Sequence, residues 1–355
     1  MSTATPNLTA PPRAIRLDTG RLPGGAVWGV YGAAAVAVLA LVVGTDLSPV
    51  LVVLGGIALA AVAIYAWSRV VEGRRQALDR TITVLVSSAF ALAVTPLISL
   101  LWTVISRGAE RFDGEFFSES ARNVVGAGGG AQHAIVGTLI ITGCATLISV
   151  PIGLMAGIYL HEYGRGPLKR WLTFFVDVMT GIPSIVAGLF AYALFALFLG
   201  PGVRLGLIGA VALSVLMIPI VVRAVEEMLK IVPQSLREAS YALGVPKWRT
   251  ILKVVLPTAL AGIITGVMVA VARIIGETAP LLITTGVVAT TNWNPFDGRM
   301  QNLPVFAYSQ YKNPGAVADP YIDRAWAAAL TLIVIVMVLN LIARLIYRRF
   351  GTEIR

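Results

Sequence analysis

The chain has 355 residues, of which 57% are hydrophobic and 13% are charged, whereas soluble globular domains carry about 25% charged residues. This composition excludes an ordinary soluble protein and indicates an integral membrane protein. The net charge of +10 does not indicate a nucleic-acid partner, because the basic residues fall between the apolar runs. The single cysteine, Cys144, excludes a disulfide within the chain, and the two histidines, His133 and His161, belong to no metal-binding pattern.

Eight apolar segments are long enough to cross a bilayer, which takes roughly 20 residues of helix. In chain order they are residues 26–43, 48–67, 82–105, 134–160, 171–199, 205–222, 258–285 and 325–347. We therefore predict an all-α polytopic membrane protein with about eight transmembrane helices, in which an N-terminal pair precedes a six-span core. Three arginines precede the first segment, as in a signal peptide, but its length and its continuation into the second segment favour a retained anchor.

The distribution of Lys and Arg predicts the orientation of these spans. An even number of spans places both termini on one side, and if that side is the cytoplasm, 20 of the 28 basic residues lie in cytoplasmic segments and 7 lie outside. The remaining one, Arg273, is the only basic residue placed within a span. The same count therefore predicts cytoplasmic termini and isolates Arg273.

Short patterns along the core predict how its helices pack and bend. GAGGGA (126–131) superficially resembles a nucleotide loop, but no strand precedes it and it contains no lysine, so we interpret it as a flexible turn. GLMAG (153–157) and GIITG (262–266) have the spacing of small residues that lets helices approach closely. Five of the spans contain an internal proline that can kink the helix: Pro96, Pro151, Pro183, Pro219 and Pro280.

The segment 223–257 is too polar to span a membrane and too patterned to be a passive linker. Pro233 can open a helix that Gly244 ends, and Pro246 can begin a second helix that runs to Leu256. We predict a short helix-turn-helix at the cytoplasmic face, with its apolar residues packed inward or into a partner and its basic residues outward. The apolar set is Leu236, Ala239, Tyr241, Leu243, Ile251 and Val255, and the basic set is Lys247, Arg249 and Lys253.

REASYALGVPKWRTILKVVLP (237–257) resembles the EAA loop of ABC importer permeases: Glu-Ala-Ala, three residues, Gly, nine residues, then Ile-x-Leu-Pro. Ser240 and Val254 replace the second Ala and the Ile. The resemblance implies a coupling helix, residues 233–256, that docks in a groove of a cytoplasmic ATPase. Its coupling residues would be Glu238, Ala239, Ser240, Gly244, Lys247, Arg249, Leu256 and Pro257. From composition alone, the segment could equally be an amphipathic helix on lipid headgroups.

Arg273 and Glu277 lie four residues apart in the seventh span. A charge at bilayer depth costs at least about 2.5–3.5 kcal/mol, so it normally faces the bundle interior and has a partner. The two residues can pair with each other on one helix face, or they can form a polar site on a translocation path, which we favour. Asp177, in the fifth span, is expected to lie near the cytoplasmic interface and to be hydrated there.

Four stretches are similar to the PstA-type permeases of phosphate importers, and the similarity runs from about residue 80 to the C-terminus. The stretches are GGAQHAIVGTL (129–139), IYLHEYG (158–164), GIPSIVAGLF (181–190) and ARIIGETAPLL (272–282). The resemblance implies that Arg273, Glu277 and Thr278 serve the phosphate path and that the chain is not itself an enzyme. It implies four regions: a two-span extension (1–69), a third span with an outside segment (70–133), a permease core (134–347) and a cytoplasmic tail (348–355).

The partners implied by this family are a paired PstC-type permease, a PstB-type ATPase dimer, an extracytoplasmic PstS-type phosphate-binding protein and membrane lipid. G-x-x-x-x-G-K-[ST] does not occur, so ATP is expected to bind the ATPase subunit and this chain to need no cofactor. Segments 106–133 and 286–324 could meet the binding protein or simply cap the bundle. Three alternatives stay open: an importer of sulfate or molybdate, an intramembrane enzyme, for which no catalytic pattern is found, and a sensor built on a permease frame.

Overall fold

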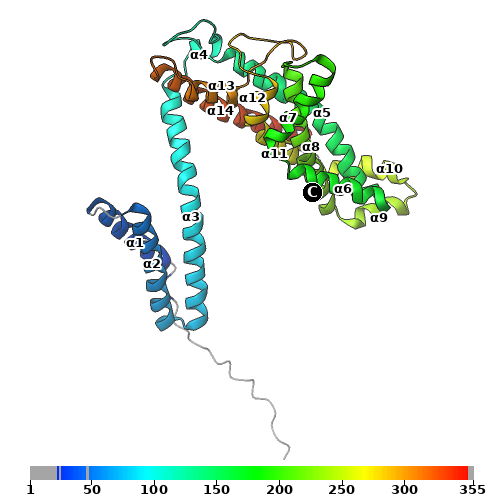
Figure 1. Ribbon diagram of the computed structural model, residues 1–355. Coiled ribbons are helices and arrows are strands. Elements are labelled where there is room, and N and C mark those ends of the chain that lie inside the picture. The colour runs from blue at the N-terminus through cyan, green and yellow to red at the C-terminus, as the bar shows by residue number, and fades with distance from the viewer. Residues whose placement is uncertain (1–21, 24, 45–47, 351–355) are drawn as a thin grey trace, which may run out of the picture. The chain divides into compact units, whose positions relative to one another are not determined.

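The computed structural model describes residues 22–23, 25–44 and 48–350. Every regular element among these residues is a helix, as the all-α prediction requires. The chain divides into two compact units, residues 1–101 and residues 102–355, and the boundary falls within one long helix, α3 (Arg74–Ala109) (Figure 1). The bounds of the four regions that the resemblance implies stay predictions.

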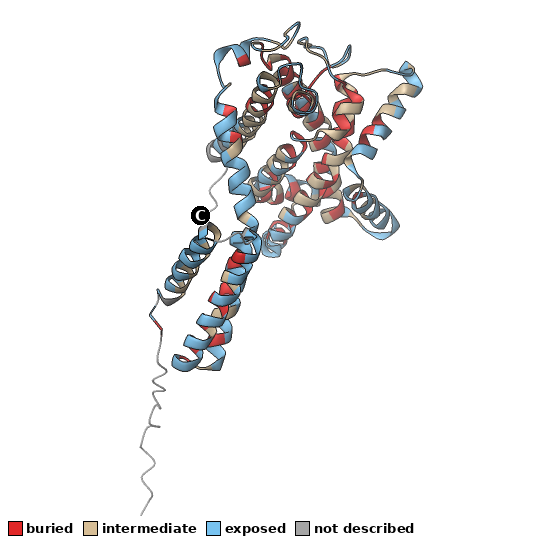
Figure 2. Cartoon of the chain, turned by 60° about the vertical axis from the view of Figure 1, so that its left-hand side comes forward, coloured by how far each residue is buried: buried red, intermediate tan, exposed pale blue. Residues whose placement is uncertain are grey.

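The first unit contains α1 (Ala26–Gly44), α2 (Pro49–Val71) and the first part of α3. Its small core consists of Ala60, Ala61, Ile64 and Val84. Most other apolar side chains of α2 and α3 are exposed, such as Leu59 at 63% and Phe90 at 71%. Figure 2 shows this exposure along most of α3. Exposed apolar surface of this extent is expected of helices that meet lipid or other membrane subunits.

Glu72 joins α2 to α3 at the turn between them. Arg80 donates two hydrogen bonds to its carboxylate, at 2.6 and 2.7 Å, and the Ser68 hydroxyl and the Leu22 amide each donate one at 2.8 Å. These hydrogen bonds lower the pKa of Glu72 from 4.5 to about 2, and those from Arg80 have the largest effect.

We expect the stability of the first unit to decrease below about pH 4.5. Because the pKa of Glu72 is lower in the folded state, its contribution is complete above 4.5 and is lost as the pH falls toward about 2. Thermal unfolding in detergent, scanned from about pH 7 to pH 3, measures this loss. Glu72→Gln should flatten the pH dependence in that range, whereas Asp79→Asn, at an exposed residue of α3, should not. The same slope in Glu72→Gln as in the unmodified protein would contradict this assignment.

The second unit is a helical bundle around α8 (Gly206–Ile231). The helices before α8 are α4 (Gly114–Ser118), α5 (Gln132–Ile158) with a π-helical end, η1 (Tyr159–Tyr163), α6 (Gly166–Thr180) and α7 (Ser184–Leu199). After it come α9 (Gln234–Ala242), α10 (Lys247–Thr250), the π-helical η2 (Ile251–Val255), α11 (Leu256–Ile274), α12 (Ala279–Thr284), α13 (Leu303–Lys312) and α14 (Asp319–Phe350). In Figure 1, α9 and α10 lie at one end of this unit, the coupling end, and α4 lies at the other, the loop end.

Glycines bring α5 and α11 close to α8, as the two small-residue patterns predict. A Cβ on Gly153 would lie 2.7 Å from Val221 of α8. In α11, a Cβ on Gly262 would lie 2.0 Å from the Met228 side chain of α8. Both patterns therefore serve helix packing in the bundle.

The structure has six helices that are long and apolar enough to cross a membrane, counted over its described residues. Helices α6 and α7 are long and apolar enough only as a pair and are bent by 110° at the break between them, as in a broken span or a re-entrant loop, and α1 contains a shorter apolar helix, Val27–Val42. The prediction of about eight membrane segments is therefore consistent with these helices. The proline kinks expected within 171–199 and 258–285 are full breaks of the helix, because Pro183 caps α7 at one break and Pro280 lies in the first turn of α12 after the other.

We expect Gly137→Ala to destabilise the bundle by about 1–3 kcal/mol, the usual cost of overpacking. A Cβ on Gly137 of α5 would lie 2.0 Å from the carbonyl oxygen of Gln301. Only a shift of the backbone can relieve this clash, because the oxygen belongs to the main chain. Gly143, on the same helix, has nothing within 4 Å of its Cβ position, so Gly143→Ala should change stability by less than about 1 kcal/mol. Thermal unfolding of both variants in detergent makes the comparison, and equal effects would contradict it.

Candidate functional site

A break in the seventh apolar segment carries the predicted pathway residues. Helix α11 ends at Ile274, residues 275–276 form a turn, and α12 begins only at Ala279. Arg273 therefore lies in the last turn of α11, whereas Glu277 and Thr278 lie in the non-helical break. The less favoured alternative, in which Arg273 and Glu277 pair on one helix face, is not what the structure shows, because the helix ends between them.

Neither charged side chain at this break has a hydrogen-bond or ion-pair partner among the residues that the structure describes. Arg273 is exposed and Glu277 is half-buried. A cation in the last turn is favoured by the helix dipole of α11, but that interaction is too weak to offset the cost of a charge at bilayer depth. The break thus presents an unpaired guanidinium and a nearby carboxylate that do not neutralise each other.

Helix α12 is fixed in place by close contacts on two sides. A Cβ on Gly188 of α7 would lie 2.6 Å from the Pro280 Cα atom, and a Cβ on Gly209 of α8 would lie 2.4 Å from Thr285. Asn302 caps α13 through the Val305 amide and also donates to the Glu277 carbonyl at 3.4 Å. The backbone on both sides of the break is therefore held by packing.

The predicted helix-turn-helix is present at the coupling end, and we call residues 233–257 the coupling element. Pro233 caps α9, Gly244 adopts φ +73 after its C-terminus, and Pro246 caps α10, as predicted. The α10 helix continues through η2 into α11. Any movement of the coupling element is thus transmitted directly to α11, the helix whose last turn contains Arg273.

The coupling element presents apolar side chains to its surroundings. Five are exposed: Leu236 (38%), Tyr241 (42%), Leu243 (83%), Trp248 (55%) and Leu252 (56%). The motif positions Glu238, Ala239, Gly244, Arg249 and Pro257 are exposed too, Leu256 is half-buried, and Ser240 is buried. Ser240 hydrogen-bonds the Thr250 hydroxyl at 2.8 Å and so ties α9 to α10. An exposed apolar set on a rigid element is typical of a protein docking surface.

A cluster around a buried ion pair joins the coupling element to the ends of α5 and α8, and we call it the Glu162 clamp: Glu162, Tyr163, Arg237 and Lys247. Arg237 donates to Glu162 at 2.9 Å and to the Leu229 and Val232 carbonyls at 3.0 and 2.7 Å. The side chains of both ion-pair partners are at most 7% exposed. Lys247 donates to the Glu162 carbonyl and lies 4.8 Å from the Tyr163 ring centre. The prediction that Lys247 faces outward is therefore wrong.

A second ion-pair group links α6 to α8 at the same end. Arg223 pairs with Asp177 and donates to Glu226 at 2.8 Å. Asp177 is 59% exposed, so it is accessible to water, as expected, but it also has a cationic partner that sequence reasoning missed.

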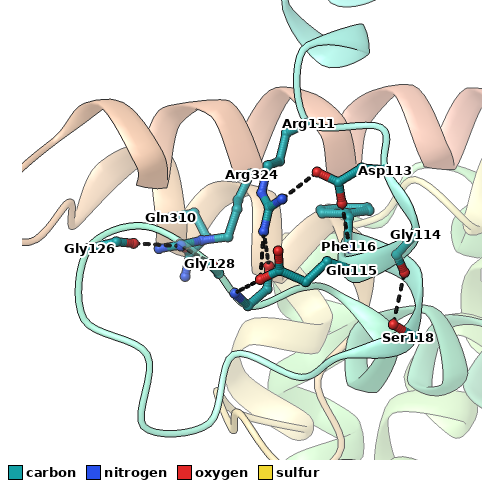
Figure 3. Close-up of polar contacts among 11 residues, drawn as sticks. Arg111, Asp113, Gly114, Glu115, Phe116, Ser118, Gly126, Gly128, Gln310 and Arg324 are labelled. Atoms are coloured by element: carbon teal, nitrogen blue, oxygen red, sulfur yellow. Dashed lines mark hydrogen bonds and ion pairs between the residues drawn. The ribbon is translucent and has the colours of Figure 1, made fainter.

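Polar contacts at the loop end hold the glycine-rich segment (Figure 3). Arg324, 2% exposed, donates to the carbonyls of Gly126 and Gly128 at 2.8 and 2.7 Å and to Gln310 at 3.1 Å. The prediction of a flexible turn at 126–131 is wrong, because a buried arginine from α14 fixes the loop.

A second arginine fixes the same loop from the α3 side. Arg111 donates to the Gly129 carbonyl at 2.9 Å and pairs with Asp113 and Glu115. Asp113 caps α4, and the hydrogen bond that it accepts from the Phe116 amide lowers its pKa. Segments 106–133 and 286–324, which could meet a binding protein or cap the bundle, are in direct contact through the bonds of Arg324 to Gly126 and Gly128.

Among the described residues, no group of three or more His, Cys, Asp and Glu side chains could hold a metal ion. The unpaired Arg273 and the exposed coupling element are two features with a clear chemical use. The first can attract an anion, and the second can receive another protein.

Comparison with known proteins gives consistent matches. The family model of the binding-protein-dependent transport system inner membrane component matches residues 149–355. The phosphate transport system permease protein PstA 1 of Mycobacterium tuberculosis (strain H37Rv) is 45% identical over 277 residues, which is 77% of this chain and 88% of that protein. The phosphate transport system permease protein PstA of Yersinia pestis is 40% identical over 281 residues, 78% and 92% of the two chains.

A solved structure of the MetNI methionine ABC transporter in an inward-facing conformation matches with a TM-score of 0.51. It is 23% identical and covers 61% of this chain and 94% of that chain. At that identity the likeness concerns the fold alone.

Proposed function

Because this chain belongs to the family of binding-protein-dependent transport system inner membrane components, we propose that it is the PstA-type permease subunit of an ATP-driven phosphate importer. Proteins of this family are multi-pass transport subunits of ABC importers and not enzymes, and their ATPase is a separate subunit. The observation that carries the choice of an anion is Arg273, unpaired among the described residues at a break in an apolar segment.

Arg273, Glu277 and Thr278 form the proposed anion site on the path. Arginine offers a planar fork of donors to oxyanions and remains charged at low dielectric. The Glu277 carboxylate can accept a hydrogen bond from protonated phosphate. Sulfate cannot donate such a bond, because it carries no proton at neutral pH. The carboxylate also weakens net anion binding, so that phosphate is passed on and not trapped. These roles favour phosphate over sulfate or molybdate as the substrate.

The coupling element is the proposed docking site of a cytoplasmic ATPase dimer of the PstB type. Its exposed apolar side chains and the exposed Glu238, Ala239, Gly244 and Arg249 support this role, and its rigid connection to α11 suits the transmission of a rigid-body movement. ATP would bind that subunit, and this chain would need no cofactor. The alternative role on lipid headgroups is less well supported, because large apolar side chains and not basic ones dominate the exposed set.

This assignment orients the molecule. The coupling end would face the cytoplasm together with both termini, and the loop end would meet a PstS-type phosphate-binding protein. The fixed loop around Gly126 and Gly128 supports that docking role, because a preorganised surface loses little entropy on binding. A PstC-type permease would complete the membrane pair and cover part of the exposed apolar surface.

Reconstitution tests the proposed function. The chain is co-expressed with its candidate partner permease, ATPase and binding protein, and the complex is placed in liposomes that contain ATP. We expect ATP-dependent uptake of labelled phosphate that excess unlabelled phosphate abolishes and excess sulfate or molybdate leaves nearly unchanged. Uptake of sulfate or molybdate in preference to phosphate would replace the assignment with another oxyanion, and ATP hydrolysis without flux of any oxyanion would refute it.

A further inference from the structure

Two arginines far apart in sequence converge at the loop-end side of α12. Arg204 lies just before α8, and Arg299 lies in the segment between α12 and α13. The Cβ position on Gly286 would be 2.9 Å from Arg204 Cδ, 3.1 Å from Arg204 Nη1 and 3.5 Å from Arg299 Cδ. The Arg204 guanidinium and the Cδ atom of Arg299 therefore lie beside the same point, and the absence of a side chain on Gly286 leaves room for the Arg204 guanidinium.

Backbone hydrogen bonds fix this convergence. The Leu205 amide donates to the Thr284 carbonyl at 3.3 Å, and the Met300 amide donates to the Thr285 carbonyl at 3.4 Å. The residue that follows Arg204 and the residue that follows Arg299 are thus both bonded to the C-terminal end of α12. These bonds also satisfy two of the carbonyls at that end, which would otherwise repel an anion.

Neither arginine side chain has a hydrogen-bond or ion-pair partner within the part of the chain that the structure describes. Asp297, two residues before Arg299, makes no ion pair with either one. By contrast, Arg111 and Arg324 at the same end of the unit are both bonded to acceptors. Two like charges on neighbouring side chains without an acidic partner repel each other, and an anion that binds between them removes that repulsion. The N-terminus of α8, which begins at Gly206, adds positive potential at the same place.

We propose that Arg204 and Arg299 form an outer oxyanion station, where inorganic phosphate binds before it reaches Arg273. This inference rests on the proposed function and adds a second site to it. Two guanidinium forks can donate several hydrogen bonds to one tetrahedral oxyanion. Arg204 is half-buried and Arg299 exposed, so solvent screens the site and binding is weak enough for release.

The position of the station defines a short path. Gly286 follows the C-terminal end of α12, whereas Glu277 and Thr278 precede its N-terminal end. The helix has six residues, and a helix of that size is about 9 Å long. The two anion sites therefore lie at opposite ends of one short, tightly packed helix.

Protection from an arginine-selective dicarbonyl reagent tests the station. The complex of the permease pair and the ATPase, without binding protein, is treated with phenylglyoxal in inorganic phosphate or in chloride of equal ionic strength. Mass spectrometry then gives the modification rate of each arginine. We expect phosphate to slow modification of Arg204 and Arg299 several-fold and to leave Arg122, exposed at the same end, unchanged. In a Gly286→Ala variant, the added Cβ displaces the Arg204 guanidinium, so protection of Arg204 should be lost.

The outcomes separate this inference from the proposed function. Protection of Arg273 without protection of Arg204 and Arg299 would overturn the station and leave the phosphate path intact. Protection that requires the binding protein would also overturn it, because the arginines would then contact that protein and not phosphate. An Arg204→Gln/Arg299→Gln double variant gives a second readout: phosphate uptake should fall at low external phosphate and recover at saturation, and an equal loss at all concentrations would contradict the station.

Discussion

Replacing Arg273 with alanine is expected to reduce phosphate uptake about 10- to 100-fold while the complex still assembles. A hydrogen bond to a charged group contributes about 1.5–3 kcal/mol, and each 1.4 kcal/mol changes a rate or an affinity tenfold. Among the described residues, the Arg273 side chain bonds to none, so its removal leaves no buried partner unsatisfied. The loss should therefore appear in transport and not in folding.

Labelled phosphate uptake into liposomes measures this loss, and size-exclusion chromatography of the solubilised complex measures assembly. Arg273→Lys keeps the charge without the planar fork and should give an intermediate rate. Arg170→Ala, at an exposed arginine of α6, is the matched control and should transport normally. Undiminished uptake by the Arg273→Ala complex would remove this residue from the path.

The break between α11 and α12 also predicts how Arg273 and Glu277 combine. Mutations of two residues that pair with each other have coupled effects on stability in a double-mutant cycle, whereas the effects of mutating residues without shared contacts are additive. Because the two side chains make no ion pair, their effects on stability should add. This separates a site that acts on a ligand from an internal ion pair, which the sequence alone left open.

Hydropathy and turn residues predict the helices and the coupling element well. Long apolar runs leave helix as the way to satisfy the backbone in lipid, and Gly244 and Pro246 mark the turn between α9 and α10 by their own backbone preferences. Hydropathy misses the breaks at 181–183 and 275–278, because an apolar average continues through a turn. Pro183 and Pro280 mark these breaks in the sequence, but a proline inside an apolar run indicates a kinked helix as readily as a broken one.

The tertiary partners could not be predicted from the sequence. Glu162 and Arg237 are 75 residues apart, and the polar pattern around each one is that of an ordinary helix end. Lys247 was expected to face outward because of its charge, but its long side chain reaches the Glu162 carbonyl. Arg204 and Arg299 converge because their neighbours bond to the end of α12, which no local pattern reveals.

The Glu162 clamp leads to the second large effect. We expect Glu162→Gln to uncouple ATP hydrolysis from phosphate uptake and to lower the phosphate moved per ATP at least about tenfold. Arg237 joins the start of the coupling element to Glu162 at the end of α5 and to the last turns of α8. Breaking a buried ion pair by removing one partner costs about 3–5 kcal/mol. Without the Glu162 carboxylate, Arg237 keeps only its bonds to the two carbonyls at the end of α8, so the coupling element loses its ion-pair link to the end of α5.

The clamp also explains why a buried ion pair is useful at this position. An apolar pair of similar volume would stabilise the bundle at least as well, but it would allow the coupling element to slide. The guanidinium group of Arg237, bonded to one carboxylate and two carbonyls, allows only one position of the coupling element relative to the ends of α5 and α8. Its role is therefore to set position, and its loss should change the stoichiometry of transport more than the amount of folded protein.

Simultaneous measurement of ATP hydrolysis and phosphate uptake in the same liposomes gives that stoichiometry. Glu162→Asp keeps the charge on a shorter side chain and should retain part of the coupling, and Lys253→Gln, at an exposed residue of the same element, should retain all of it. Thermal unfolding identifies any variant that has lost its fold. A folded Glu162→Gln complex that moves as much phosphate per ATP as the unmodified complex would rule out the clamp as the link, and transmission would then run only through the continuous helix from α10 to α11.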